Sequence, residues 1–363
     1  MKGMLRHIWP VSKLYQLSER VYSLQENIRS LERKTKELES INAENQKTII
    51  ALNSTIDRYH IEIEKANKLL CEKGQAFDKY KNETADYDWY SKYGYDWMIA
   101  DLQMSCVEAL LPGNRERLLS LKNTHQGESC FIIGNGPSLK AQDLEALKNN
   151  HIFSFASKRI NLIYDQTSWR PDIWGASDLD YIETNLEEIK AMSGYKKLLC
   201  AQTITRQIGI DENAIYYPFI QVERRPPWFN ADVMRGVHFW GTITCKLINI
   251  AVYMGFSQIY LLGVDNTFPY KRNKKGEYVC EVDEKNHFSD KYYDKKYAER
   301  LSKNIDDVIK AKQYMDESYR SVKWHCDSMG VSVVNATRGG ELEIFPRMEF
   351  ERVVEKIKKN SIV

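Results

Sequence analysis

The residues with the clearest chemistry form a glycine turn, Gly134-Asn-Gly-Pro-Ser138, directly after the apolar run Cys130–Ile133. Its two glycines let the backbone approach a ligand closely, and either can adopt a positive φ. The proline can begin a helix, and the serine can cap that helix or donate a hydrogen bond to a phosphate. The turn has neither the third glycine of a dinucleotide-binding fingerprint nor the Lys-Ser/Thr pair of a P-loop. It predicts an anion site, with a purely structural turn and cap as the alternative.

Histidine and carboxylate side chains offer a second kind of chemistry. His287 stands in a loop, and a histidine titrates close enough to neutral pH to serve as a general base. Asp178 and Asp180 follow an expected strand end, where parallel sheets bind ligands. The two carboxylates could contact a ligand, hold a metal–nucleotide complex or form a helix N-cap cluster.

A rigid basic and aromatic loop, Glu223–Phe229, could bind an acceptor. Sugars stack on aromatic rings and anionic glycans pair with arginine, so Arg224, Arg225 and Trp228 are candidate acceptor-binding residues. The basic run Lys271–Lys275 is expected to be a solvated loop.

Short apolar runs that alternate with helical stretches must position these residues. This alternation predicts an α/β domain with a Rossmann-like, mostly parallel sheet and ligands at the carboxyl ends of its strands. We expect strands at 130–133, 152–156, 172–176, 197–201, 258–263 and 331–335, and helical stretches at 139–149, 160–164, 181–192, 244–254 and 304–329.

A heptad repeat precedes this domain, over residues 14–70. The a series begins with Val21 and Ile28 and the d series with Leu17 and Leu24, and neither glycine nor proline interrupts the repeat. The spacing predicts a left-handed coiled coil about 85 Å long. β-branched a residues with leucine at d favour a parallel dimer, and a trimer and a surface helix packed on its own domain stay open.

The pattern divides the chain into five segments. They are a basic N-terminal tail (1–13), the oligomerising coiled coil (14–70), a helical connector (71–127), the α/β domain (128–355) and a C-terminal tail (356–363). The tail carries Lys2, Arg6, Trp9 and Lys13, which could touch an anionic membrane surface; a frayed terminus is the alternative.

Composition limits the class of protein. The chain has 363 residues and a net charge of +2, from 52 basic and 50 acidic side chains, which argues against a nucleic-acid binder. Seven scattered cysteines favour reduced thiols over disulfides or a zinc site. Because we find no apolar run that could span a membrane and no signal peptide, we expect a cytoplasmic protein, with peripheral attachment at the inner face of the membrane as an option.

Four ordered blocks between residues 129 and 350 resemble known families. Phe131–Lys140 resembles the first strand, turn and helix of the bacterial sialyltransferases of glycosyltransferase family 42 and of the wider MptE-like family of polysaccharide and flagellin glycosylation loci. Gly241–Thr244 with Asn249–Asp265 and Asn286–Asp290 resemble later motifs of the same families, and Asn335–Pro346 is typical of the MptE-like branch.

The resemblance implies a metal-independent, inverting transferase on a variant of the GT-A fold, with a CMP-activated sugar as donor and no cofactor. His287 would be the general base, and an acceptor hydroxyl would lose its proton to it. The family's tyrosine for the leaving phosphate aligns with Thr267, and Tyr270, the second catalytic candidate, or Tyr278 could substitute for it. By position, the nucleotide and donor residues would be Gly134, Asn135, Gly136, Pro137, Ser138, Ser157, Arg159, Asp178, Thr242, Thr244 and Asp265.

Three residues depart from the family pattern: Ser157 replaces an asparagine, Trp240 an arginine and Thr267 a tyrosine. The donor could therefore carry sialic acid, Kdo or another nonulosonic acid, and the acceptor would be a cell-surface glycan. Two other readings stay open. One is a pyrophosphokinase with Mg²⁺ on Asp178, Asp180 and Asp265, and the other is a coiled-coil scaffold with a nucleotide-binding domain in polysaccharide assembly.

Overall fold

The computed structural model describes residues 9–39, 49–50, 52–62, 64–65, 68, 95–221, 228–238, 240–267, 270–272, 278–280, 287–289 and 305–360. The chain forms two compact units. The first contains residues 1–116 and 201–212, and the second contains residues 117–200 and 213–363.

The first unit is helical. It contains α1 (Trp9–Glu39), helical residues between 49 and 68, α4 (Tyr95–Leu110) and the short α9 (Gln202–Thr205), while α5 (Asn114–Leu119) crosses into the second unit. α4 packs against both α1 and α9. Among the described residues, we find no helix with the length and apolar character needed to cross a membrane.

The heptad segment folds back on itself. Ile56 packs in one hydrophobic cluster with Val21, Leu24 and Ile28 of α1. In one continuous helix, Ile28 and Ile56 would lie about 42 Å apart, so the predicted straight rod over residues 14–70 is wrong. The cluster nevertheless consists of predicted a and d positions, which bury their side chains against the same chain. Self-association through this segment stays a prediction.

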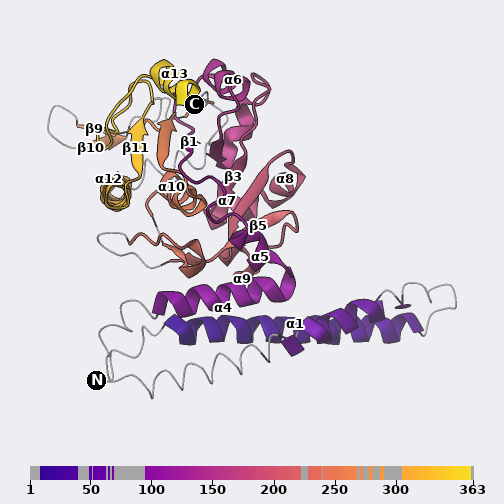
Figure 1. Cartoon of the computed structure of the whole chain (residues 1–363). Helices are drawn as coiled ribbons and strands as arrows, with labels where there is room; N and C mark the ends of the chain where they lie inside the picture. The colour runs from indigo at the N-terminus through magenta and orange to yellow at the C-terminus, as the bar shows by residue number, and fades with distance from the viewer. Residues whose placement is uncertain are drawn as a thin grey trace, which may run out of the picture. The chain divides into compact units, whose positions relative to one another are not determined.

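The second unit contains a seven-stranded sheet in the described part of the chain (Figure 1). Its order is β11-β8-β1-β2-β3-β4-β5, and every adjacent pair is parallel. The strands are β1 (Ser129–Ile133), β2 (Ser154–Ser157), β3 (Ile173–Ala176), β4 (Lys196–Cys200), β5 (Ala214–Tyr217), β8 (Gln258–Leu262) and β11 (Ser332–Asn335). This confirms the predicted α/β class and the mostly parallel sheet.

Helices connect and cover these strands. α10 (Ile243–Met254), which is buried almost throughout, packs on β1 and β3, and α12 (Ile305–Ser328) packs on α10 and β11. The remaining elements are α6 (Ala141–Asn149), η4 (Lys158–Ile163), α7 (Leu179–Thr184), α8 (Leu186–Ala191), η5 (Val233–Arg235), α13 (Phe350–Asn360), and the two-stranded pairs β6 (Phe219–Ile220) with β7 (Val237–His238) and β9 (Tyr270–Arg272) with β10 (Tyr278–Cys280).

Local hydrogen bonds explain where the helices differ from the prediction. The expected helix 181–192 is two helices, because Asn185 ends α7 with a side-chain hydrogen bond to the Tyr181 carbonyl (2.7 Å). The expected helical stretch 160–164 is a 3₁₀ helix, η4, that begins at Lys158.

The strand order reverses direction at β1. From β1 the chain continues to β2 on one side, while β8 returns on the other side. Ligands of open parallel sheets bind outside the carboxyl ends of the strands at such a reversal. The loops after β1, β2, β3 and β8 therefore frame the candidate site.

Candidate functional site

The glycine turn after β1 is packed tightly against the loop after β8. The Gly134 amide donates to the Leu262 carbonyl and the Gly136 amide to the Gly263 carbonyl, both at 2.8 Å. A Cβ on Gly136 would lie 1.8 Å from the Asp265 Oδ2 atom, and one on Gly134 would lie 2.3 Å from the Gly263 oxygen. Neither turn glycine has a positive φ. Both glycines are therefore needed for contact between the two loops, whereas the sequence predicted contact with a ligand.

Ser138 anchors a carboxylate in place of capping a helix. Its hydroxyl donates to Asp265 Oδ2 at 2.8 Å, and the Leu139 amide closes a β-turn on the Gly136 carbonyl at 3.1 Å, with Pro137 in the position that prolines favour. α6 begins two residues beyond the predicted start, and Lys140 precedes it without a side-chain cap. The predicted cap role of Ser138 is wrong. Burial raises the pKa of the Asp265 carboxyl, and the Ser138 hydrogen bond opposes that rise.

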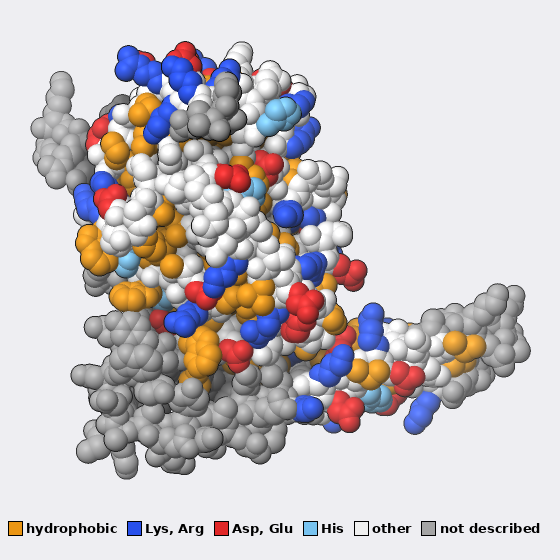
Figure 2. Space-filling model, viewed as in Figure 1, with side chains coloured by type: hydrophobic (Ala, Val, Ile, Leu, Met, Phe, Trp, Pro, Cys, Tyr) orange, Lys and Arg blue, Asp and Glu red, His pale blue; other side chains and the backbone are white. Residues whose placement is uncertain are grey.

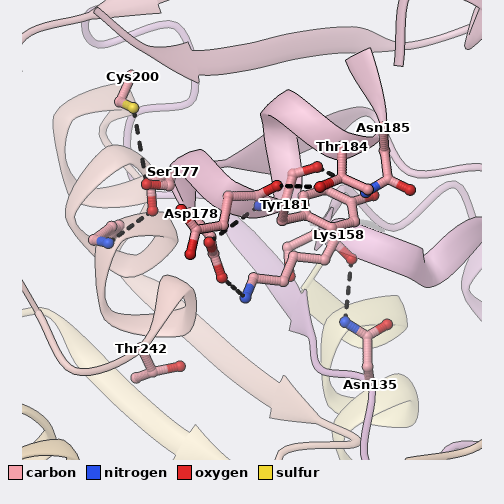
Figure 3. A network of polar contacts seen from close by, with 12 residues as sticks. Asn135, Lys158, Ser177, Asp178, Tyr181, Thr184, Asn185, Cys200 and Thr242 are labelled. Atoms are coloured by element: carbon pink, nitrogen blue, oxygen red, sulfur yellow. Dashed lines mark hydrogen bonds and ion pairs between the residues drawn. The ribbon is translucent and has the colours of Figure 1, made fainter. Parts of the chain in front are cut away.

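Lys158 brings positive charge to the end of β2. Its φ of 48° is left-handed, a conformation that costs a non-glycine residue energy and recurs at functional sites. The Trp174 indole N–H donates to the Lys158 carbonyl at 2.8 Å and holds this backbone. The Lys158 ammonium lies 2.7 Å from Asp178 Oδ2 (Figure 3).

Asp178 is engaged on both sides. Besides its pairing with Lys158, it caps α7 by accepting from the Tyr181 amide at 3.2 Å, so the N-cap interpretation of this aspartate is confirmed. Burial would raise the pKa of the Asp178 carboxyl, but the neighbouring Lys158 charge and these hydrogen bonds lower it overall. Asp180 lies exposed in the first turn of α7.

A second lysine lies buried at the end of β3. The ammonium of Lys246, from α10, donates to the Ser177 hydroxyl at 2.7 Å and lies 4.6 Å from the centre of the Phe219 ring. Burial lowers the pKa of this lysine to about 8. Sequence reasoning missed both lysines. One signal was available for Lys246, which is the one charged residue in the mostly apolar α10.

His287 lies beside the glycine turn. The amide of the next residue, Phe288, donates to the Asn135 carbonyl at 3.1 Å, and the Asn135 side chain donates to the Ser157 carbonyl at 3.1 Å. Burial, assisted by the Lys158 charge, lowers the pKa of the His287 imidazole to about 3. The structure thus places the predicted base and the predicted nucleotide turn side by side at the carboxyl ends of β1 and β2.

Two threonines begin α10 and face a tyrosine that the sequence analysis missed. Thr242 caps the helix by accepting from the Thr244 amide at 3.3 Å. Tyr319 of α12 is almost fully buried and hydrogen-bonds to both threonine hydroxyls, and burial raises the pKa of its phenol. Gly241 allows this contact, because a Cβ there would lie 2.8 Å from the Met315 backbone.

The remaining predicted residues lie elsewhere or outside the described residues. The Arg159 guanidinium donates to Asn185 at 3.2 Å, at the junction of α7 and α8, and Trp228 packs edge-on against the His325 ring. Arg224, Arg225 and the side chains of Tyr270 and Tyr278 lie outside the described residues. Of the departures, Trp240 is buried and Thr267 is partly exposed.

The carboxylates proposed for Mg²⁺ do not converge. Asp178 follows β3 and Asp265 follows β8, with β1 and β2 between these strands. A strand spacing of about 4.8 Å places the two positions roughly 14 Å apart, too far for one magnesium ion. Within the residues described here, no group of three or more His, Cys, Asp or Glu side chains is arranged to hold a metal ion.

Comparisons with known proteins match part of the chain that forms this site. A sequence model described as 6-hydroxymethylpterin diphosphokinase MptE-like matches residues 108–271, a span that includes the glycine turn, both lysines and Asp265 but not His287. We find no match among curated proteins. Among solved structures, the chain is similar to the MAf glycosyltransferase from Magnetospirillum magneticum AMB-1, with 14% identity and a TM-score of 0.39. The similarity covers 68% of this chain and 40% of the MAf chain.

Proposed function

We propose that this protein transfers a sugar from a CMP-activated donor to a hydroxyl group of a cell-surface glycan, with inversion and without a metal. The sugar would be sialic acid, Kdo or a related nonulosonic acid. The observation that supports the proposal is the 3.1 Å hydrogen bond between the Phe288 amide and the Asn135 carbonyl, because it holds the segment of His287 beside the glycine turn. Self-association through the heptad segment, as a dimer or trimer, and attachment at the inner membrane face belong to the same proposal.

The chemistry requires a base and a stabilised leaving group. The acceptor oxygen attacks the anomeric carbon, the bond from that carbon to the phosphate oxygen breaks, and CMP leaves with the electron pair. His287 takes the acceptor proton. Burial lowers the pKa of this imidazole to about 3, which keeps it unprotonated at neutral pH but makes it a weak base, so the role requires a higher pKa of His287 in the substrate complex. As in glycoside hydrolysis, the transition state resembles an oxocarbenium ion.

The positive groups of the site would serve the departing phosphate. Lys158 follows β2, and the Lys246 ammonium reaches from α10 to Ser177 at the end of the neighbouring β3. The amino end of α10 adds the positive end of a helix dipole. Preorganised positive charge in a water-poor site stabilises a developing anion without reorganisation. These groups would replace the metal that other nucleotide-sugar enzymes use.

A second candidate is diphosphate transfer from ATP, which the MptE-like match favours. It would need Mg²⁺ on carboxylates. Among the predicted ligands, Asp178 is paired with Lys158 and Asp265 with Ser138. A magnesium site would therefore need different ligands or a rearrangement of both pairs.

A thermal-shift panel separates these functions. CMP, CDP, UDP, GDP and ATP are each added with EDTA or with Mg²⁺, at about 100 times the dissociation constant, where a ligand stabilises by about 2.7 kcal/mol. We expect selective stabilisation by CMP in EDTA. Stabilisation only by ATP with Mg²⁺ would replace our proposal with diphosphate transfer, and no shift with any nucleotide would favour a non-catalytic scaffold.

A further inference from the structure

An open cleft of about 650 Å³ lies along one face of α12. Asp316, Arg320, Trp324 and Asp327 line it at helical spacing, and Glu341 and Glu343 line it from the loop after β11. The stretch of helix from Asp316 to Asp327 is about 16 Å long. The volume is in the range of ligand clefts, and the length suits an extended chain better than a compact small molecule.

The cleft begins at the candidate site. The Asn266 side chain donates to Asp316 at 2.8 Å, and the Glu341 amide donates to the Asp265 carbonyl at 2.7 Å. Asp265 is also the carboxylate that Ser138 of the glycine turn holds. A chain lying in the cleft would therefore have one end at the carboxyl edge of β8, beside the nucleotide turn.

Trp324 lies at the other end of the cleft and is 66% exposed. Its ring meets the His325 ring edge-on at 4.7 Å, and His325 in turn stacks on Phe229 at 5.4 Å. Hydrophobic side chains are grouped on the left of Figure 2, in the region where Figure 1 labels α12, with charged side chains beside them. An exposed aromatic face of this kind can pack against the C–H face of a sugar ring.

The charge of the cleft limits which sugars fit. Its lining contains four acidic and two basic side chains. Asp316 pairs with Lys312, Asp327 with Lys323, and Glu343 with Arg347, so the cleft offers a polyanionic chain no excess of positive charge. The Glu341 side chain lies exposed, where its carboxylate can accept hydrogen bonds from sugar hydroxyls or amides.

We propose that this cleft binds the acceptor glycan, a neutral or amino-sugar chain, with Trp324 as the stacking platform away from the reaction centre. The inference rests on the proposed transferase function and adds the class of acceptor to it. The charged sugar would then enter the product only through the donor.

The test measures saccharide binding without catalysis. Isothermal titration of the full chain with a tetrasaccharide of N-acetylglucosamine and with a tetrasaccharide of sialic acid gives both affinities. We expect the neutral chain to bind and the sialic acid chain to bind at least tenfold more weakly. Trp324→Ala should weaken binding of the neutral chain at least tenfold. Trp97→Ala, which removes a tryptophan 52% exposed on α4, should leave it unchanged.

Two results would overturn the inference: wild-type protein that binds neither saccharide, or a Trp324→Ala variant that binds the neutral chain as the wild type does. Thermal stabilisation by CMP is read on the same variants. CMP binding with unaltered saccharide binding in Trp324→Ala rejects the cleft and leaves the transferase in place. Trp324-dependent saccharide binding without any CMP response rejects the transferase and supports the cleft as a carbohydrate site.

Discussion

The two sides of the candidate site are held together by different kinds of interaction. On the β1 and β8 side, Gly134 and Gly136 press directly against the loop that ends in Asp265, and the contacts are backbone hydrogen bonds at 2.8 Å. On the β2 and β3 side, Lys158 and Lys246 bring buried or half-buried positive charge to Asp178 and Ser177. The β1 and β8 side, called the shape side below, is defined by steric contact between backbone segments. The β2 and β3 side, called the field side, supplies a positive electrostatic field.

This difference suggests a division of labour. In the function that we propose, the close-packed backbone on the first side would recognise the shape of the nucleoside. A pair of lysines favours an anion of almost any outline, as a leaving phosphate requires. His287 lies between the two sides. Its segment is hydrogen-bonded to Asn135 on the first side, and the Lys158 charge on the second side lowers the pKa of its imidazole.

Removing the group between the two sides should have the largest effect. We expect His287→Ala to reduce transfer by about 10² to 10⁴, the usual contribution of a general base, while CMP still raises the thermal stability. Steady-state transfer and thermal shift measured on the same variant check this. Equal loss of CMP binding and of transfer would mean that the imidazole supports the fold of the pocket and not the proton transfer.

Breaking the shape side should cost stability and nucleotide binding together. Gly136→Ala would place a methyl group against the Asp265 side chain and the Gly263 carbonyl, so we expect a loss of about 1–3 kcal/mol in the free energy of unfolding. Chemical denaturation measures it. The control is Gly194→Ala, where φ is 89° but nothing lies within 4 Å of the added Cβ, so it isolates backbone strain. If only the control lost stability, contact between the two loops would not explain the glycine.

Neutralising the field side should affect anion binding more than stability. Lys246→Met removes a charge that burial disfavours, so we expect stability at pH 7 to stay the same or rise, while affinity for CMP falls about tenfold and affinity for cytidine is unchanged. Lys197→Met is a matched control, since this buried lysine of β4 donates to the carbonyls of Ile189 and Lys190. If both variants bound CMP like the wild type, the lysine side would not receive phosphate.

The same lysine has a pH signature. Its pKa falls from 10.5 in the unfolded chain to about 8 in the folded one, so between these values the unfolded state binds more protons. The free energy of unfolding should therefore gain from this group as pH rises from about 8 to 10.5, and lose that gain as pH falls back. Subtracting the unfolding curve of Lys246→Met from that of the wild type isolates the effect from the titrating tyrosines. A flat difference would mean that the lysine is solvated.

Much of the sheet could be predicted from sequence because its signals are local. β1, β3, β4, β8 and β11 are buried on both faces, so each is a short apolar run that ends near a glycine or a polar residue. The heptad repeat was local in the same way. It identified the buried face at Val21, Leu24 and Ile28, but spacing alone does not say whether the partner is another chain or residue Ile56 of the same one.

Only part of the candidate site could be predicted, because only part of it is marked by local sequence signals. The glycine turn and His287 carry recognisable motifs, and the structure places them together. The role that we propose for Lys158 and Lys246 depends on the order of the strands, which puts the end of β2 next to the end of β3, the strand on which α10 packs. That order is a property of the fold, so Lys158 gave no local reason to choose it, and the local signal for Lys246 was its charge in an otherwise uncharged helix.

The smallest effect that we predict is that of the Lys158 charge on the pKa of His287. Burial and the Lys158 charge together lower the pKa of His287 to about 3, so the wild type should show no loss of kcat/KM from this group between pH 8 and pH 5. Lys158→Gln removes the charge but not the burial, and should move the His287 titration to higher pH without returning it to 6.5. Proton NMR of the imidazole follows this directly, and Lys190→Gln, which breaks a surface pair with Glu187, is the control. An unchanged titration in Lys158→Gln would mean that the Lys158 charge does not influence the His287 imidazole. The two sides would then act on the substrate independently.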